Sequence, residues 1–105
     1  MARRKSKKQK EYQKYLRSKE WKATRERYWN SKLPKVCYVC LGTGTLALHH
    51  RTYERLGSER LTDLVPVHNG CHKKIHSFHN RNRHLTLWEA TAAVRKQTLD
   101  RRKKK

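Results

Sequence analysis

Apolar and aromatic residues recur at helix-like intervals in the first part of the chain, within residues 11–30. The recurring positions are Tyr12, Tyr15, Leu16, Trp21, Tyr28 and Trp29. Ser18 is suited to cap a helix, so we predict one helix that is broken there. The aromatic rings could stack on nucleic-acid bases, but a stripe at helical spacing is more typical of a core, which we favour. Residues 1–10 show no such period and predict a disordered basic arm.

Two short apolar runs in the middle of the chain predict strands. The first covers residues 45–50, and the second covers residues 64–67. Pro66 lacks an amide hydrogen, so the second strand is expected at a sheet edge. A helix capped by Asn69 is expected to follow and to run through about Phe78. The order is therefore strand, loop, strand, helix.

The C-terminal part of the chain predicts one more helix. Thr86 and Glu89 have the spacing of a capping box, and the helix should run through about Thr98 before the basic tail of residues 101–105. The whole pattern predicts an α+β fold in which residues 11–100 form a single domain, with helices flanking a small central unit.

Composition indicates a small core that needs reinforcement. The chain has 105 residues, of which 34% are hydrophobic, and domains of this size often depend on a structural metal. Three cysteines cannot pair completely and no apolar signal region is present, so we expect a reducing, cytoplasmic setting rather than secretion. No apolar run approaches the roughly 20 residues that cross a bilayer.

The formal net charge of +20 points to a polyanionic partner. A solvated basic surface or an anionic membrane is the alternative. We favour nucleic acid, because an excess so large and of one sign exceeds what solubility requires.

Four residues have the spacing of zinc ligands: Cys37, Cys40, His68 and Cys71. Paired ligands at each end would let one tetrahedral ion join two distant segments and supply folding energy. A Cys-x-x-Cys pair can instead be a redox motif, but nothing around it resembles the strand and helix of a thioredoxin. A structural Zn²⁺ is therefore the preferred interpretation.

Four histidines form a second group. His72 and His76 are four residues apart and share one face of the predicted helix. His49 and His50 end the first predicted strand, where adjacent side chains point to opposite faces, so they should have different tasks. Imidazoles both bind divalent ions and accept protons near neutral pH, which indicates a metal-dependent hydrolytic site.

Taken together, these motifs resemble the HNH endonuclease family. The resemblance covers about residues 36–78 and rests on Cys37-x-x-Cys40, Leu46-x-Leu48-His49-His50, Gly57-x-Glu59, Asp63-Leu64 and Cys71-His72-x-x-x-His76. It implies the ββα-metal fold, in which two strands and a helix surround one divalent ion.

The resemblance also implies roles for individual residues. His50 would be the general base, and His49 would hold a catalytic Mg²⁺ or Mn²⁺ together with His72, His76 or both. Asp63 stands where the family has its middle asparagine and is a catalytic candidate, although a turn-forming role is equally compatible. His68 replaces the cysteine that is more usual at the fourth zinc position. The products would carry 5′-phosphate and 3′-hydroxyl ends.

The positions of the residues around this core predict their roles. Arg51 and Lys73 adjoin the proposed base and ion, so we expect them to bind DNA. Glu59 is interpreted as fixing the loop. His79 and His84 lie outside the motif and are expected at the surface or on backbone phosphates.

The resulting hypothesis is a zinc-containing DNA endonuclease or nickase of low sequence selectivity, with DNA as partner and no membrane. Since the family occurs in bacteria and phages, we expect a bacterial or phage-infected cytoplasm, with phage packaging or recombination proteins as possible partners. The alternative is a non-catalytic zinc-containing nucleic-acid-binding module. A third class is an RNA-binding, ribosome-associated protein, which has no need for adjacent histidines.

Overall fold

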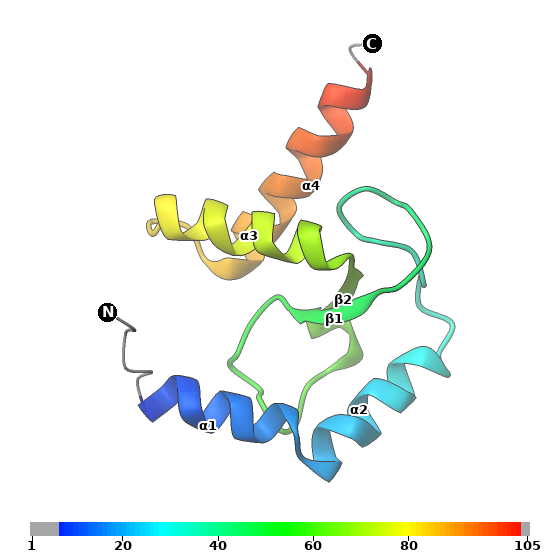
Figure 1. The fold of residues 1–105 in the computed structure, drawn as a ribbon, viewed down its shortest axis with the longest axis vertical. Coiled ribbons are helices and arrows are strands. Elements are labelled where there is room, and N and C mark those ends of the chain that lie inside the picture. Colours follow the sequence, from blue (N-terminus) through cyan, green and yellow to red (C-terminus); the bar gives the residue numbers. More distant parts are fainter. Residues whose placement is uncertain (1–6, 104–105) are drawn as a thin grey trace.

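The computed structural model of the chain describes residues 7–103, in which four α-helices flank a two-stranded antiparallel sheet (Figure 1). The elements are α1 (Lys7–Leu16), α2 (Lys19–Trp29), β1 (Ala47–His50), a 3-10 turn (Leu61–Asp63), β2 (Leu64–Val67), α3 (Asn69–Arg81) and α4 (Leu87–Lys103). The predicted α+β class is confirmed. β1, β2 and α3 follow one another in the predicted order.

The first two helices are separated at Ser18, as the sequence predicts. The Ser18 hydroxyl accepts a hydrogen bond from the Trp21 amide at 3.1 Å and donates one to the Tyr15 carbonyl at 2.6 Å. The expected disordered arm is wrong for residues 7–10, which belong to α1. Lysine and glutamine are good helix formers, and that preference acts without any apolar period. Residues 1–6 lie outside the described part.

β1 is shorter than predicted and begins at Ala47. Gly44 has a φ of 108° and bends the chain just before it, so the expected start at residue 45 is wrong. Leu48 pairs with Pro66 and His49 with Val65. With two strands, β2 lies at an edge as expected.

The last two helices are longer than predicted. α3 reaches Arg81, and its N-cap is His68 rather than Asn69. The capping box of α4 is confirmed, with Glu89 N–H to Thr86 Oγ1 at 3.1 Å and Thr86 N–H to Glu89 Oε1 at 2.9 Å. α4 then continues through Lys103, because its exposed basic residues also favour helix.

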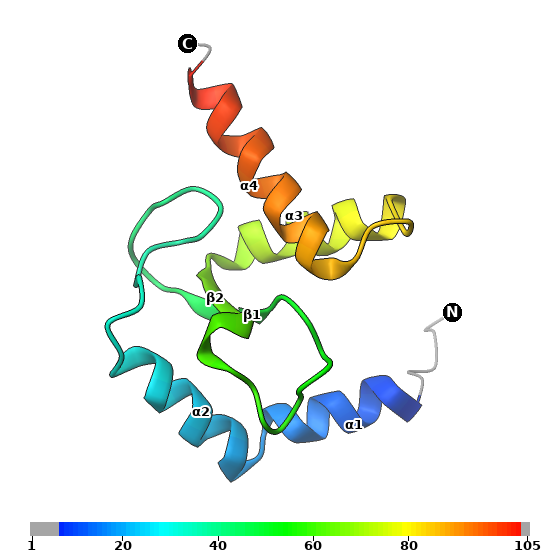
Figure 2. The same ribbon diagram turned by 180° about the vertical axis from the view of Figure 1, so that it is seen from behind.

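The core lies on both faces of the sheet. On one face β2 packs with α3, α4 and the segment before β1, through Cys37, Val39, Val65, Val67, Ile75, Leu87 and Val94. On the other face the sheet packs against α2, through Trp21, Tyr28, Leu48 and Leu64. Figure 2 shows α3 and α4 on one side of the strands and α1 and α2 on the other. Trp21 and Tyr28 are thus core residues, as predicted.

Candidate metal centres

The four predicted zinc ligands come together. One ligand atom from each of Cys37, Cys40, His68 and Cys71 lies within 4.8 Å of the others, so the cluster could bind a metal ion and is compatible with structural zinc. Burial raises the pKa of the Cys37 thiol, but backbone N–H groups outweigh this and lower it to about 6. Burial and the neighbouring Cys37 raise the pKa of Cys71 to about 12. A bound cation would reverse that second shift.

His68 is oriented as a ligand. Its Nε2 lies 2.8 Å from the Thr43 carbonyl, which can only accept, so Nε2 carries the proton. Nδ1 is then the free lone pair, and it lies 3.2 Å from Cys40 Sγ. Gly42 allows this approach, since a Cβ there would be 3.1 Å from the His68 ring.

The second cluster contains His49 from β1 and His72 and His76 from α3. One ring nitrogen of each lies within 4.8 Å of the others, and the Nε2 atoms of His72 and His76 are 3.0 Å apart. Two nitrogens at about 2.1 Å from one ion, at right angles, would also be about 3 Å apart. The three histidines that sequence analysis assigned to a second ion therefore converge.

The hydrogen bonds of His49 fix its tautomer. The Thr91 hydroxyl on α4 donates to the Leu87 carbonyl at 2.7 Å, so it accepts from His49 Nε2, which is 2.9 Å away. His49 Nδ1 is then a buried lone pair, and it has no hydrogen-bond partner within residues 7–103. A buried acceptor without a partner costs about 1–3 kcal/mol, which a bound cation would offset.

All three histidines of this cluster are held neutral. Burial, followed by the neighbouring His72, lowers the pKa of His49 to about 2. Burial, followed by His76, lowers the pKa of His72 to about 4, and burial likewise lowers that of His76. Neutral imidazoles are the form that binds metal. Because nitrogen is the only donor type in the cluster, a transition ion suits it better than Mg²⁺.

His50 lies in a different environment from His49. Its Nε2 is 2.8 Å from Glu59 Oε2, its Nδ1 is 3.1 Å from the Tyr12 hydroxyl, and the residue is only 1% exposed. The ring of Trp21 is 4.6 Å away, between centroids. Burial lowers the pKa of His50, while the Glu59 carboxylate acts in the opposite direction. Both ring nitrogens of the predicted general base are therefore engaged.

Glu59 does more than the loop-fixing role expected of it. Its carboxylate accepts from the Tyr15 hydroxyl at 2.7 and 2.8 Å and from the Gly57 amide at 3.2 Å, besides its contact with His50. It thus connects α1, the loop and the end of β1. The partners Tyr12, Tyr15 and Thr91 were missed because spacing does not show which distant side chains meet. A threonine within the apolar face of a helix was the one signal for Thr91.

Asp63 is held by arginine. Its two oxygens accept from Arg55 Nε at 2.8 Å and Nη2 at 2.6 Å, and from the Arg60 amide at 3.1 Å. These contacts lower its pKa, with the Arg55 bonds as the main cause. Asp63 belongs to neither ligand cluster among the described residues. In this arrangement it anchors the loop that follows β1.

Arg51 and Lys73, the two predicted DNA contacts, differ in how tightly the fold holds their side chains. The Arg51 guanidinium carbon lies 3.8 Å from the centroid of the Trp88 ring, and the group also donates to the Thr62 carbonyl. Lys73 is exposed.

His79 Nε2 donates to the Leu85 carbonyl at 2.9 Å, so it holds the turn between α3 and α4.

Comparisons with known proteins gave no relatives: a scan of protein-family models, a search of curated proteins and a search of solved structures each found nothing that matches the chain. Within residues 7–103, no helix has both the length and the apolar character needed to cross a membrane. The geometry of the two clusters and the positive charge are therefore the features of the chain that indicate a function.

Proposed function

We propose that the chain is a metal-dependent DNA endonuclease or nickase of the HNH type. The observation that carries the proposal is the convergence of His49, His72 and His76, in which His49 Nδ1 is buried and unpartnered among the described residues. Such an arrangement is costly unless a cation is bound. The net charge of +20 supplies attraction to the phosphate backbone.

The chain's own residues divide the work. His49, His72 and His76 would hold the ion, which when bound supplies Lewis-acid stabilisation of charge on the phosphate oxygens. Arg51 and Lys73 flank the histidines in the sequence and would contact the DNA backbone. Cys37, Cys40, His68 and Cys71 would hold a structural Zn²⁺ that keeps the first turn of α3 in place.

His50 is the proposed general base, and Glu59 would orient it. The Glu59 carboxylate accepts a hydrogen bond from the Nε2–H group of His50. Nδ1 is then the nitrogen with a lone pair that can remove a proton from water. Tyr12 now donates to that nitrogen. For hydrolysis, the attacking water would replace the Tyr12 hydroxyl at that nitrogen.

The all-imidazole ligand set makes Mn²⁺ the preferred catalytic ion over Mg²⁺. Mg²⁺ is usually held through carboxylates and retains its water. Cleavage should therefore be faster with Mn²⁺ than with Mg²⁺ at equal concentration.

Plasmid nicking tests the proposal. Protein in which only the cysteine site is filled with Zn²⁺ is incubated with supercoiled plasmid and Mn²⁺, as wild type, His72→Ala, His50→Ala and His84→Ala. We expect His50→Ala to lose about 10²- to 10⁴-fold in rate, His72→Ala to be similarly impaired, and His84→Ala, an exposed histidine outside both clusters, to equal wild type. Zinc content and circular dichroism verify that each variant is folded.

The outcomes separate two functions. Cleavage by His50→Ala at the wild-type rate would eliminate the proposed base. Binding without cleavage by wild type would favour a non-catalytic zinc-containing DNA-binding module. The observation in favour of that second function is the burial of His50, with both of its nitrogens engaged.

A further inference from the structure

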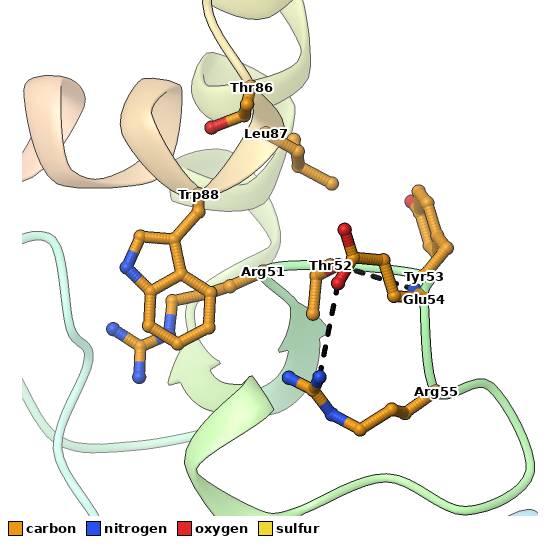
Figure 3. A pocket seen from close by; sticks show the side chains of 8 residues that line it. All are labelled: Arg51, Thr52, Tyr53, Glu54, Arg55, Thr86, Leu87 and Trp88. Atoms are coloured by element: carbon orange, nitrogen blue, oxygen red, sulfur yellow. Dashed lines mark hydrogen bonds and ion pairs between the residues drawn. The ribbon is translucent and has the colours of Figure 1, made fainter.

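A hollow of about 290 Å³ lies between the loop after β1 and the start of α4 (Figure 3). It is lined by Arg51, Thr52, Tyr53, Glu54, Arg55, Thr86, Leu87 and Trp88. Three large hydrophobic side chains are exposed among residues 7–103, and two of them line this hollow: Tyr53 is 44% exposed and Trp88 is 38% exposed. Two exposed aromatic rings facing one hollow indicate a ligand with a flat, apolar surface.

The hollow also has fixed positive charge. Arg51 stacks on Trp88, with its guanidinium carbon 3.8 Å from the ring centroid. Arg55 is paired with both oxygens of Asp63, which offsets its charge, so Arg51 is the guanidinium of the lining that has no carboxylate partner among residues 7–103. The acid in the lining, Glu54, is solvent-exposed and lies 3.9 Å from Arg55. A ligand suited to these walls combines an aromatic ring with negative charge.

The hollow adjoins the proposed reaction centre. The Tyr53 ring lies 5.8 Å from the His50 ring, between centroids. On the other side, Leu87 accepts the hydrogen bond of Thr91, which in turn contacts His49. Figure 3 shows Trp88 from α4 and Tyr53 from the loop on opposite sides of the hollow.

We propose that this hollow binds one unpaired nucleobase of a DNA strand, next to the phosphate that is cut. The proposal rests on the proposed function for its location, but its binding test does not require cleavage. A base within a duplex has both faces covered by its neighbours, so only an unstacked base can enter. A volume of about 290 Å³ is at the lower end of small-ligand sites and suits a single base. The protein should therefore prefer DNA that contains an extruded or single-stranded nucleotide.

The test measures equilibrium binding of zinc-loaded protein without added Mn²⁺ or Mg²⁺. Three fluorescein-labelled duplexes are compared by anisotropy: a fully paired duplex, the same duplex with a single-nucleotide bulge, and the same bulge with an abasic nucleotide. The abasic duplex keeps the phosphate and the flexibility but removes the ring. Wild type should bind the base-containing bulge about 5- to 100-fold more tightly than the abasic bulge, as expected for one base stacked on an aromatic side chain.

Variants test whether the preference for the base-containing bulge over the abasic bulge depends on the hollow. Trp88→Ala and Tyr53→Ala should each bring the ratio of affinities close to one, while Trp88→Phe should keep most of it. Leu41→Ala removes the third exposed hydrophobic side chain, which does not line the hollow, and should leave the ratio unchanged. Circular dichroism and zinc content verify the fold.

Equal affinity of wild type for the two bulged duplexes would overturn the proposal, and so would a full preference in Trp88→Ala and Tyr53→Ala. These results are independent of the nuclease proposal. A protein that prefers the base but does not cleave would refute only the endonuclease, and a protein that cleaves without the preference would refute only the base site.

Discussion

Each of the two adjacent histidines donates a hydrogen bond from Nε2 to a fixed partner. The acceptor is the neutral hydroxyl of Thr91 for His49 and the carboxylate of Glu59 for His50. A carboxylate stabilises a protonated imidazole, whereas a hydroxyl does so far less. The same side chain is therefore suited to bind a cation at position 49 and to accept a proton at position 50. Thr91 and Glu59 are the residues that make this difference.

The role of Thr91 can be tested by metal affinity. Thr91→Val removes the acceptor of the His49 proton, so the ring loses its fixed tautomer, while Thr91→Ser keeps it. We expect Thr91→Val to weaken binding at the histidine cluster by about 10- to 100-fold, as is usual for partners of ligating histidines. Titration with Co²⁺ after the cysteine site is filled with Zn²⁺ measures this. Thr98→Val, on the same helix, is the control, and unchanged affinity in Thr91→Val would contradict the prediction.

Asp63 predicts an acid-dependent loss of stability. Its pKa is lowered in the folded chain, mainly by Arg55, so the Asp63–Arg55 pair stabilises the fold above the ordinary aspartate pKa of about 3.9. That contribution is lost as the pH falls through the lowered value. Denaturant unfolding of wild type and Asp63→Asn should therefore differ at pH 6, and the difference should shrink as the pH falls below the ordinary aspartate pKa. A constant difference over this range would show that Asp63 is not the titrating group.

At the scale of elements, α1 covers the proposed base. Tyr12 donates to His50 Nδ1, and Tyr15 donates to both oxygens of Glu59. The helix thus does two opposing things: it occupies the lone pair of the base and it stabilises the group that orients the base.

The two tyrosines should respond differently to loss of their hydroxyl groups. Tyr12→Phe frees His50 Nδ1 and should raise the rate of plasmid nicking a few fold. Tyr15→Phe leaves a buried carboxylate with fewer donors and should lower both nicking and stability, by about 1–3 kcal/mol in denaturant unfolding. A large loss of nicking in Tyr12→Phe would mean that this hydroxyl takes part in proton transfer instead of blocking it.

Residues that are close in sequence were sufficient to predict several features of the structure. The break at Ser18, the capping box at Thr86 and the convergence of His72 and His76 all depend on neighbours a few residues apart, and all were predicted from sequence. The convergence of Cys37, Cys40, His68 and Cys71 was also predicted, because paired ligands at each end of a loop constrain one another. What the sequence could not provide were contacts across the fold, such as Tyr12 with His50 at a separation of 38 residues.

At the scale of the molecule, the sheet separates two groups of helices. α3 carries His72, His76 and Lys73, while α2 covers the opposite face. If DNA approaches the histidine cluster, basic residues on α3 should contact phosphate and those on α2 should contribute less.

The salt dependence of DNA binding can show whether the α3 side or the α2 side of the molecule contacts phosphate. Lys73→Ala should weaken binding to any duplex sequence and reduce the slope of log K against log salt by about 0.9, which corresponds to one lost phosphate contact. Lys22→Ala, an exposed lysine on α2, removes the same charge and should change the slope much less. Equal slopes for both variants would indicate that binding involves overall charge rather than the α3 face.

The bond between Thr91 and His49 joins the last helix to the first strand across 42 positions. A growing polypeptide that has left the ribosome only as far as α3 already carries all seven candidate ligands, but it lacks the hydroxyl that fixes the ring of His49. We therefore expect the cysteine site to load early in synthesis and the histidine site to load late. Any activity that depends on an ion at the histidine site would then begin only after α4 has formed.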